Sequence, residues 1–289
     1  MHAPHAVVAG YDGSSDSRAA VEYAAAAARD LGLPLRVVHC CAWSDAQTAV
    51  FTAAGRMLAE LCEVLEPRYP GLQLEPIVLS KSPAIALIGE SLAAEMLVVG
   101  YQGMGTFGGL HTGAVSRQVA NQASCPVVVT RNAERPDGPV VVTTGPEGDA
   151  ANGILRIVEP AKREPAGPAD SPDVADAMRF AFAEASRREV ALYAFQLSAD
   201  TALSDELPDE TFSGLLSEWQ GRYPAVQAEG QCVARTQAVD RLLTATQHAG
   251  LLVVGTPGTG HGRGMRLGRL PSTLLSSASC PVAVVETSS

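Results

Sequence analysis

The chain repeats itself at a fixed offset, and this duplication constrains its fold more than any other feature. Residues 98–119 and 253–274 each contain an apolar run that ends in glycine, followed by a glycine-rich loop. The offset is 155 residues (255 − 100), and it holds for Gly100 and Gly255, Gly103 and Gly258, Gly113 and Gly268, and Cys125 and Cys280. A chain of 289 residues with this repeat predicts two domains, each large enough for its own core. We expect domains over 1–132 and 138–289, separated in the polar, turn-rich segment 131–138.

Composition excludes several classes of protein. Hydrophobic residues make up 46% and charged residues 18% of the chain, as in folded globular proteins. The sequence shows no apolar run that would span a bilayer and no secretory signal pattern, so we expect a cytoplasmic protein without membrane contact. The net charge of -10 disfavours binding to nucleic acid. The six cysteines form no C-x-x-C pair and have no histidine at zinc spacing, so we expect neither a disulfide nor a metal site.

Strand and helix patterns alternate along both repeats. The first repeat predicts strands at 6–10, 33–41, 72–80, 96–100 and 125–131 and helices at 14–32, 45–71, 82–95 and 113–124. The second predicts strands at 138–145, 189–197, 226–234, 251–255 and 280–286 and helices at 171–188, 209–224, 236–250 and after the loop. It also carries an insertion near 146–170 that the first repeat lacks. Strands that are apolar on both faces and alternate with helices indicate an α/β fold with a parallel sheet covered on both sides.

The glycines after the fourth strand of each repeat point to a ligand. In an open parallel sheet, ligands bind beyond the carboxyl ends of the strands, where the strand order reverses. A glycine-rich loop that leads into a helix presents backbone N–H groups and the positive end of the helix dipole, which suits phosphate. A tight turn is the alternative, because G-x-x-G spacing alone is a weak signal. The duplicated triplet, with nine residues between its second and third glycines, favours the phosphate site.

Two features of the chain resemble the universal stress protein superfamily. One is the pair of glycine loops, each preceded by "VVG" and followed by "CPV", and the other is the opening stretch "VVAGYDGSSDSRAAVEYA". The resemblance covers nearly the whole chain. It implies two tandem doubly wound domains of the adenine nucleotide alpha hydrolase-like type, each with a five-stranded parallel sheet of strand order 3-2-1-4-5. Strands 1 and 4 are then neighbours at the switch point.

The resemblance also implies an ATP site in the first domain. Asp12 matches the acid that contacts the nucleoside, and Cys40 matches the backbone position that lines the adenine pocket. The positions that match the phosphate contacts are Gly100, Gly103, Gly113, Val115 and Ser116. Ala114 stands where the family usually has a serine or threonine, so we expect a lower affinity from the missing hydroxyl.

The second domain departs further from the family pattern. Thr144 takes the place of Asp12 when the first strands are aligned, and Ala169 does so when the following helices are aligned. Pro271 replaces Ser116 and removes a backbone donor from the helix start. We therefore expect one strong site per chain and a weaker one, of unknown ligand, made of Gly255, Gly258, Gly268 and Arg269. The same loop carries further positive charge, which indicates either a solvated surface or a more anionic ligand, from His261, Arg263 and Arg266.

The function that these features favour is a regulatory, ATP-binding protein of the stress response, with ATP bound alone or with magnesium. Hydrolysis by a P-loop needs a lysine on the phosphates, but Lys81 and Lys162 both lie outside the glycine loops, so we lean away from an enzyme. His39 lies within an apolar strand and is interpreted as a packed core histidine.

Two alternatives from other classes stay open. "DGSSDS", residues 12–17, faintly resembles the pyrophosphate loop of adenylating enzymes, and the chain can also be read as an interaction module without a ligand. For assembly, the apolar last strands "PVVVT" and "PVAVVE" are expected sheet edges. By resemblance to tandem family members, we expect an intrachain pseudo-dimer and a homodimer.

Overall fold

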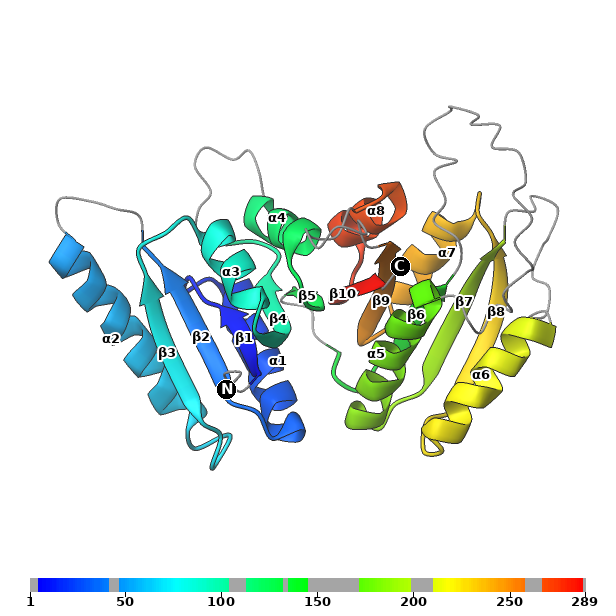
Figure 1. Ribbon diagram of the computed structural model, residues 1–289, viewed down its shortest axis with the longest axis horizontal. Coiled ribbons are helices and arrows are strands. Elements are labelled where there is room, and N and C mark those ends of the chain that lie inside the picture. The colour runs from blue at the N-terminus through cyan, green and yellow to red at the C-terminus, as the bar shows by residue number, and fades with distance from the viewer. Residues whose placement is uncertain are drawn as a thin grey trace. The chain divides into compact units, whose positions relative to one another are not determined.

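The chain divides into two compact units, and the boundary between them in the sequence lies between Glu134 and Arg135. The computed structural model describes residues 5–41, 47–103, 113–131, 135–144, 172–198, 210–257 and 267–287. The insertion expected near 146–170 lies outside the described residues. Each unit is a layered α/β structure, and each is described by itself below (Figure 1).

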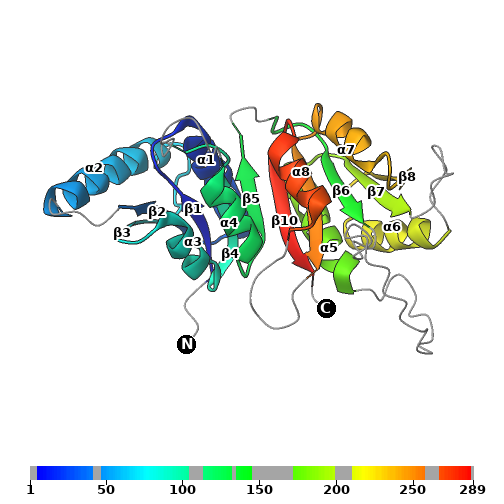
Figure 2. The same cartoon turned by 90° about the horizontal axis from the view of Figure 1, so that it is seen from above.

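The first unit has a parallel sheet with the strand order β3-β2-β1-β4-β5, as predicted. Its elements are β1 (Ala6–Gly10), α1 (Ser15–Leu31), β2 (Leu35–Cys40), α2 (Gln47–Leu65), β3 (Leu74–Leu79), α3 (Pro83–Ser91), β4 (Ala94–Gly100), α4 (Ala114–Gln122) and β5 (Val127–Thr130). Helices α1 and α2 cover one face of the sheet, and α3 and α4 cover the other (Figure 2). The strand order reverses between the neighbours β1 and β4, which places a switch point there.

Helix α1 shows why these residues form this element. Ser14 is its N-cap, with a side-chain oxygen that accepts a hydrogen bond from the Ser17 amide. Asp16 places negative charge in the first turn, where the helix dipole favours it. The helix ends at Gly32, which has a φ of 65° that a residue with a side chain rarely adopts. Small alanines along one face are fully buried, so the helix lies close against the sheet.

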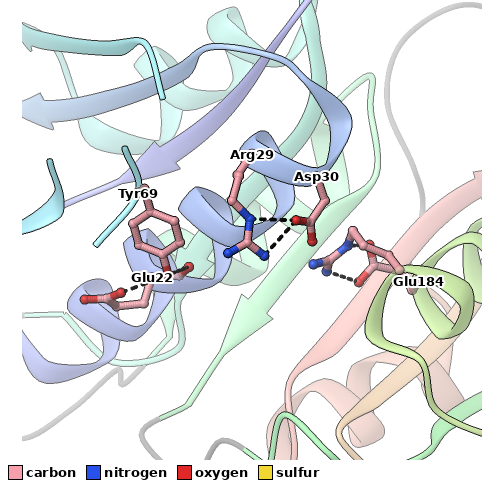
Figure 3. Close-up of polar contacts among 6 residues, drawn as sticks. Glu22, Arg29, Asp30, Tyr69 and Glu184 are labelled. Carbon is pink, nitrogen blue, oxygen red and sulfur yellow. Dashed lines mark hydrogen bonds and ion pairs between the residues drawn. The ribbon is translucent and has the colours of Figure 1, made fainter. Parts of the chain in front are cut away.

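A polar cluster joins α1 to the turn after α2. The Tyr69 hydroxyl donates to Glu22 Oε2 at 3.2 Å (Figure 3). Arg68 forms an ion pair with the same carboxylate. The Arg29 guanidinium lies 5.7 Å from the centre of the Tyr69 ring, and it also pairs with Asp30. Burial, together with the Glu22 carboxylate, raises the pKa of the Tyr69 hydroxyl, so Tyr69 stays a neutral hydrogen-bond donor.

The second unit repeats the same order, β8-β7-β6-β9-β10, with parallel strands. Its elements are β6 (Val140–Thr144), α5 (Pro172–Arg188), β7 (Leu192–Ser198), α6 (Glu210–Arg222), β8 (Ala228–Ala234), α7 (Ala238–Thr246), β9 (Leu251–Pro257), α8 (Arg269–Ser277) and β10 (Val282–Thr287). Stacked rings of Phe182, Trp219 and Tyr223 pack α5 against α6. Glu184 is buried and is neutralised by ion pairs with Arg187 and Arg188 of its own helix.

Several element boundaries differ from the sequence prediction, and three of them show why. The helix expected over 82–95 ends at Ser91, because Ala94 already pairs with Ala6 in the sheet. The strand expected from residue 189 begins at Leu192, since Glu189 has a φ of 55° and lies in a turn. The strand expected over 251–255 continues to Pro257. Among the described helices, none has the length and apolar character needed to cross a bilayer.

Candidate functional site

A cavity of about 380 Å³ opens at the carboxyl end of the first unit's sheet. Its walls come from the ends of β1, β2 and β4, the start of α4 and one side of α3. All the site residues predicted for the first domain line this one cavity: Asp12, Cys40, Gly100, Gly103, Gly113, Val115 and Ser116. The fold therefore brings together residues from three strands and one helix at the switch point between β1 and β4.

One wall of the cavity is apolar. It is formed by Val38 at the end of β2, Val99 at the end of β4, and Pro83 and Leu87 of α3. Gly10 lies between them, and a Cβ there would lie 3.2 Å from Leu87 Cδ1 and 3.3 Å from Val99 Cγ1. A wall of this kind accepts a flat ring by burial of apolar surface, whereas the opposite wall is polar.

Asp12 begins the polar wall, and its carboxylate is held in one orientation. Asp12 Oδ1 accepts hydrogen bonds from the Ser14 amide at 3.0 Å and from Ser14 Oγ at 2.6 Å. Asp12 Oδ2 lies beside Gly103, where an added Cβ would lie only 2.5 Å from it. Glycine at residue 103 thus lets the loop pass directly over the acid.

Gly100 and Gly113, the other two glycines of the motif, are required for different reasons. A Cβ on Gly100 would lie 2.6 Å from the Asp16 carbonyl carbon and 2.7 Å from the Ser17 amide nitrogen, so only glycine lets β4 end so close to α1. Gly113 has a φ of 87°, and a Cβ there would lie 3.1 Å from the Tyr101 ring. Close approach and a left-handed turn therefore explain why this strand end is rich in glycine.

Helix α4 starts at the cavity and has no side-chain N-cap. Gly113 precedes it, and the first helical hydrogen bond runs from the Arg117 amide to the Gly113 carbonyl at 3.0 Å. The amides of Ala114, Val115 and Ser116 consequently have no acceptor within the helix. Backbone donors at the positive end of a helix dipole favour an anion.

Ser116 ties the two ends of the glycine loop together. Its buried hydroxyl lies 3.1 Å from the Gly113 carbonyl oxygen and 3.4 Å from the Tyr101 carbonyl oxygen, and it donates to this pair. Because a hydroxyl has one proton, Ser116 meets an anion through its backbone amide. Val115, in contrast, is 38% exposed at the cavity mouth.

His39 also lines the cavity, so its interpretation as a packed core histidine is wrong. The ring is half-buried, and Nδ1 lies 2.8 Å from the Tyr11 carbonyl oxygen. A carbonyl only accepts, so Nδ1 carries the proton and Nε2 is left as an acceptor in the neutral ring. One sequence feature could have placed His39 in the cavity. It directly precedes Cys40, at the carboxyl end of a strand.

Two further residues of the cavity were missed, although they lie inside the glycine motif. Tyr101 and Gln102 follow Gly100, and both line the cavity. The Arg131 guanidinium lies 4.3 Å from the centre of the Tyr101 ring. This cation–π contact holds the ring in place. The spacing of the glycines carries no information on the residues between them.

The Cys40 thiol is protonated at neutral pH. Burial raises the pKa of this thiol to about 11, and the neighbouring Cys41 and the Glu90 carboxylate contribute to the shift. A protonated thiol is a poor nucleophile and a poor metal ligand, so Cys40 acts here as a cavity wall. Within the described part of the chain, no cluster of three or more His, Cys, Asp or Glu residues could hold a metal ion.

The residues on either side of the corresponding loop in the second unit differ in conformation from those in the first unit. Strand β9 passes through Gly255 and stays paired with β10 as far as Pro257, whereas β4 ends at Gly100. Gly268 precedes α8 with extended backbone, φ −65° and ψ −178°, in contrast to the left-handed Gly113. Arg269 is exposed at the first position of α8, with the buried Pro271 two residues later, while Gly258, His261, Arg263 and Arg266 lie outside the described residues.

Comparisons with known proteins agree with this architecture. The model of the universal stress protein family matches residues 4–131. A universal stress protein of Mycolicibacterium smegmatis is 31% identical over 309 residues, which cover 97% of each chain. One from Mycobacterium tuberculosis is 30% identical over 322 residues, which cover 96% of this chain and 94% of the relative.

A solved structure shows the same fold over both halves. The crystal structure of a universal stress protein from Archaeoglobus fulgidus aligns with a TM-score of 0.67 at 18% identity. The alignment covers 97% of this chain and 98% of the other. At 18% identity, the similarity shows a common fold and nothing about function.

Proposed function

The chain belongs to the universal stress protein family, and from this premise we propose that its first unit binds an adenine nucleotide, ATP, and acts as a nucleotide-dependent regulator of the stress response. The observation that carries the proposal is the single cavity shared by Asp12, the three glycines and the uncapped start of α4. Magnesium, a ligand of the second unit and a homodimer stay predictions.

The two walls of the cavity suit the two ends of a nucleotide. The adenine ring packs against the apolar wall of Val38 and Leu87, beside the backbone of Cys40. The Asp12 carboxylate accepts hydrogen bonds from ribose hydroxyls, for which Ser14 has already oriented it. The phosphates lie against the first-turn amides of α4, where the helix dipole adds to the backbone donors.

The residues of the cavity favour binding over hydrolysis. None of the described residues that line it is a lysine or an arginine, so the described wall offers no cation to stabilise charge that develops on a transferred phosphoryl group. Backbone amides alone hold an anion, but they accelerate its hydrolysis less than a lysine or an arginine would. A regulator that changes state with bound nucleotide needs no more than this.

The adenylating alternative finds less support in the turn over residues 12–17. In that reading the start of α1 would hold pyrophosphate, but Ser14 Oγ already accepts from the Ser17 amide at 3.2 Å and caps this helix. The Ser14 hydroxyl is also committed to Asp12. Helix α4, which has no such cap, is the better anion site.

Calorimetric titration of the full-length chain with ATP tests the proposal. We expect Asp12→Ala to weaken binding by roughly 10- to 100-fold, since a hydrogen bond to a charged group contributes about 1.5–3 kcal/mol. Gly113→Val should weaken binding still further, because a β-branched residue at a φ of 87° distorts the start of α4.

Glu95→Ala is the matched control, because Glu95 is an exposed acid on β4 beside His5, away from the cavity. Thermal unfolding of each variant separates loss of binding from loss of fold. Equal affinity for ATP in the wild type, Asp12→Ala and Glu95→Ala would show that the site is assigned wrongly.

A further inference from the structure

Gln102, the second of the two residues between Gly100 and Gly103, is held at both its amide and its carbonyl by the start of α1. The Gln102 amide donates to Asp16 Oδ2 at 2.9 Å, although 86 positions separate the two residues. The Gln102 carbonyl oxygen lies 3.2 Å from Ser14 Oγ, which shares its proton between this oxygen and Asp12. Two polar contacts thus attach the first turn of α1 to the point where the chain leaves β4.

The backbone of Asp16 is itself fixed by the sheet. The buried Thr130 hydroxyl, at the end of β5, lies 3.1 Å from the Asp16 carbonyl oxygen and donates to it. Gly100 packs directly against the same carbonyl group. With its main chain held by two strands, Asp16 offers a rigid carboxylate to the Gln102 amide.

Gln102 lies between two residues that contact the other parts of the site. Gly103 follows it and lies directly over Asp12 Oδ2. Tyr101 precedes it and contacts Gly113, the residue from which α4 starts. A shift of the Gln102 peptide would therefore move the chain relative both to the acid and to the uncapped amides of α4.

The second unit lacks the amide donor that Gln102 supplies in the first unit. Pro257 occupies the position that matches Gln102 at the 155-residue offset (102 + 155), and proline has no amide hydrogen to donate. There the strand does not turn at its glycine but stays paired with β10, opposite Thr287. In the second unit, where this donor is missing, strand β9 thus stays in the sheet two residues further than β4 does.

We propose that Asp16 is a positioning residue that sets the affinity of the first unit for the phosphates of its nucleotide. The inference rests on the proposed nucleotide site. Asp16 does not line the cavity and acts through the Gln102 amide, which fixes the glycine loop. At the nucleoside end, the Ser14 amide also holds the Asp12 carboxylate, and the apolar wall comes from β2, β4 and α3, so neither needs the Gln102 amide.

The test compares ATP with adenosine on the full-length chain. ATP binding is measured by calorimetry and adenosine binding by ligand-observed NMR titration. For Asp16→Ala we expect about a tenfold loss of ATP affinity, as for one charge-assisted hydrogen bond, and a change in adenosine affinity of less than about twofold. Asp16→Asn keeps an oxygen that accepts from Gln102, so its ATP affinity should return to within about threefold of the wild type.

Asp30→Ala, at the other end of α1, is the control for changes in that helix. Equal losses for ATP and adenosine in Asp16→Ala, no loss for either, or failure of Asp16→Asn to restore ATP binding would overturn the positioning role while leaving the site intact. A wild-type chain that binds neither ligand would instead refute the nucleotide site, and this inference with it. The ratio of the two affinities separates positioning from stability, since unfolding lowers both together.

Discussion

The three glycines of the first loop serve three different physical needs. Gly100 allows the close approach of two backbones, Gly103 allows the chain to pass over a carboxylate, and Gly113 supplies a left-handed turn. The sequence shows only that all three are glycine. Which need each one meets depends on neighbours from α1 and β4, so it becomes visible only in the fold.

Substitution of two glycines by alanine should have opposite effects on stability. Gly100→Ala should cost about 1–3 kcal/mol, because its Cβ would press on backbone atoms of Asp16 and Ser17 that cannot move aside. Gly89→Ala should stabilise the chain by about 0.5–1 kcal/mol, since Gly89 is exposed within α3 and nothing lies within 4 Å of an added Cβ. Thermal or urea unfolding of both variants checks this, and a Gly100→Ala chain as stable as the wild type would contradict the close approach.

The Cys40 thiol gives a prediction on pH. Burial holds its pKa at about 11, so only the small thiolate fraction reacts at neutral pH. In the folded chain, alkylation of Cys40 by iodoacetamide should speed up about tenfold per pH unit from pH 7 to 10, because the thiolate fraction grows at that rate below the pKa. In the urea-unfolded chain the rate should level off near pH 9, since a free thiol has a pKa of about 8.5. Tandem mass spectrometry separates Cys40 from Cys41, and a folded-state plateau below pH 9 would contradict the shift.

At the level of helices and strands, the sequence predicted most of the structure, because local signals determine most of it. Strand β1 matches the expected bounds, and α1 begins and ends at its serine and glycine caps. The errors occur where pairing between distant strands overrides local propensity. Ala94 looks like the continuation of an alanine-rich helix, but the sheet takes it as a strand residue opposite Ala6.

The candidate site was predictable in outline for the same reason. Glycine spacing and the opening acid are sequence features, and they located Asp12 and the loop that faces it. His39 and Gln102 act through contacts with residues far away in the chain, Tyr11 at 28 positions and Asp16 at 86 positions. No local pattern reports such contacts, so these roles could not be predicted from the sequence.

At the scale of the whole molecule, duplication has produced two units of equal strand order whose glycine motifs begin and end differently. The first unit turns at Gly100, orients Asp12 and leaves the start of α4 uncapped. The second keeps its strand paired to Pro257 and starts α8 from an extended Gly268. The sheet of each unit is fixed by its apolar strands, whereas the loops beyond the strands carry little of the core and were free to diverge.

This asymmetry predicts one strong ATP site per chain. Pro271 lies in the first turn of α8, where it removes a backbone N–H that a phosphate would use, and Arg269 beside it is exposed. An exposed arginine attracts an anion, but salt screens this attraction, and charge alone does not select adenine. Calorimetric titration at physiological salt should therefore saturate at one ATP per chain. Arg269→Gln should leave both stoichiometry and affinity unchanged, whereas Asp12→Ala should weaken the one strong site. Saturation at two ATP per chain with equal affinities would show that the second unit, despite Pro257 and Pro271, binds nucleotide as well as the first.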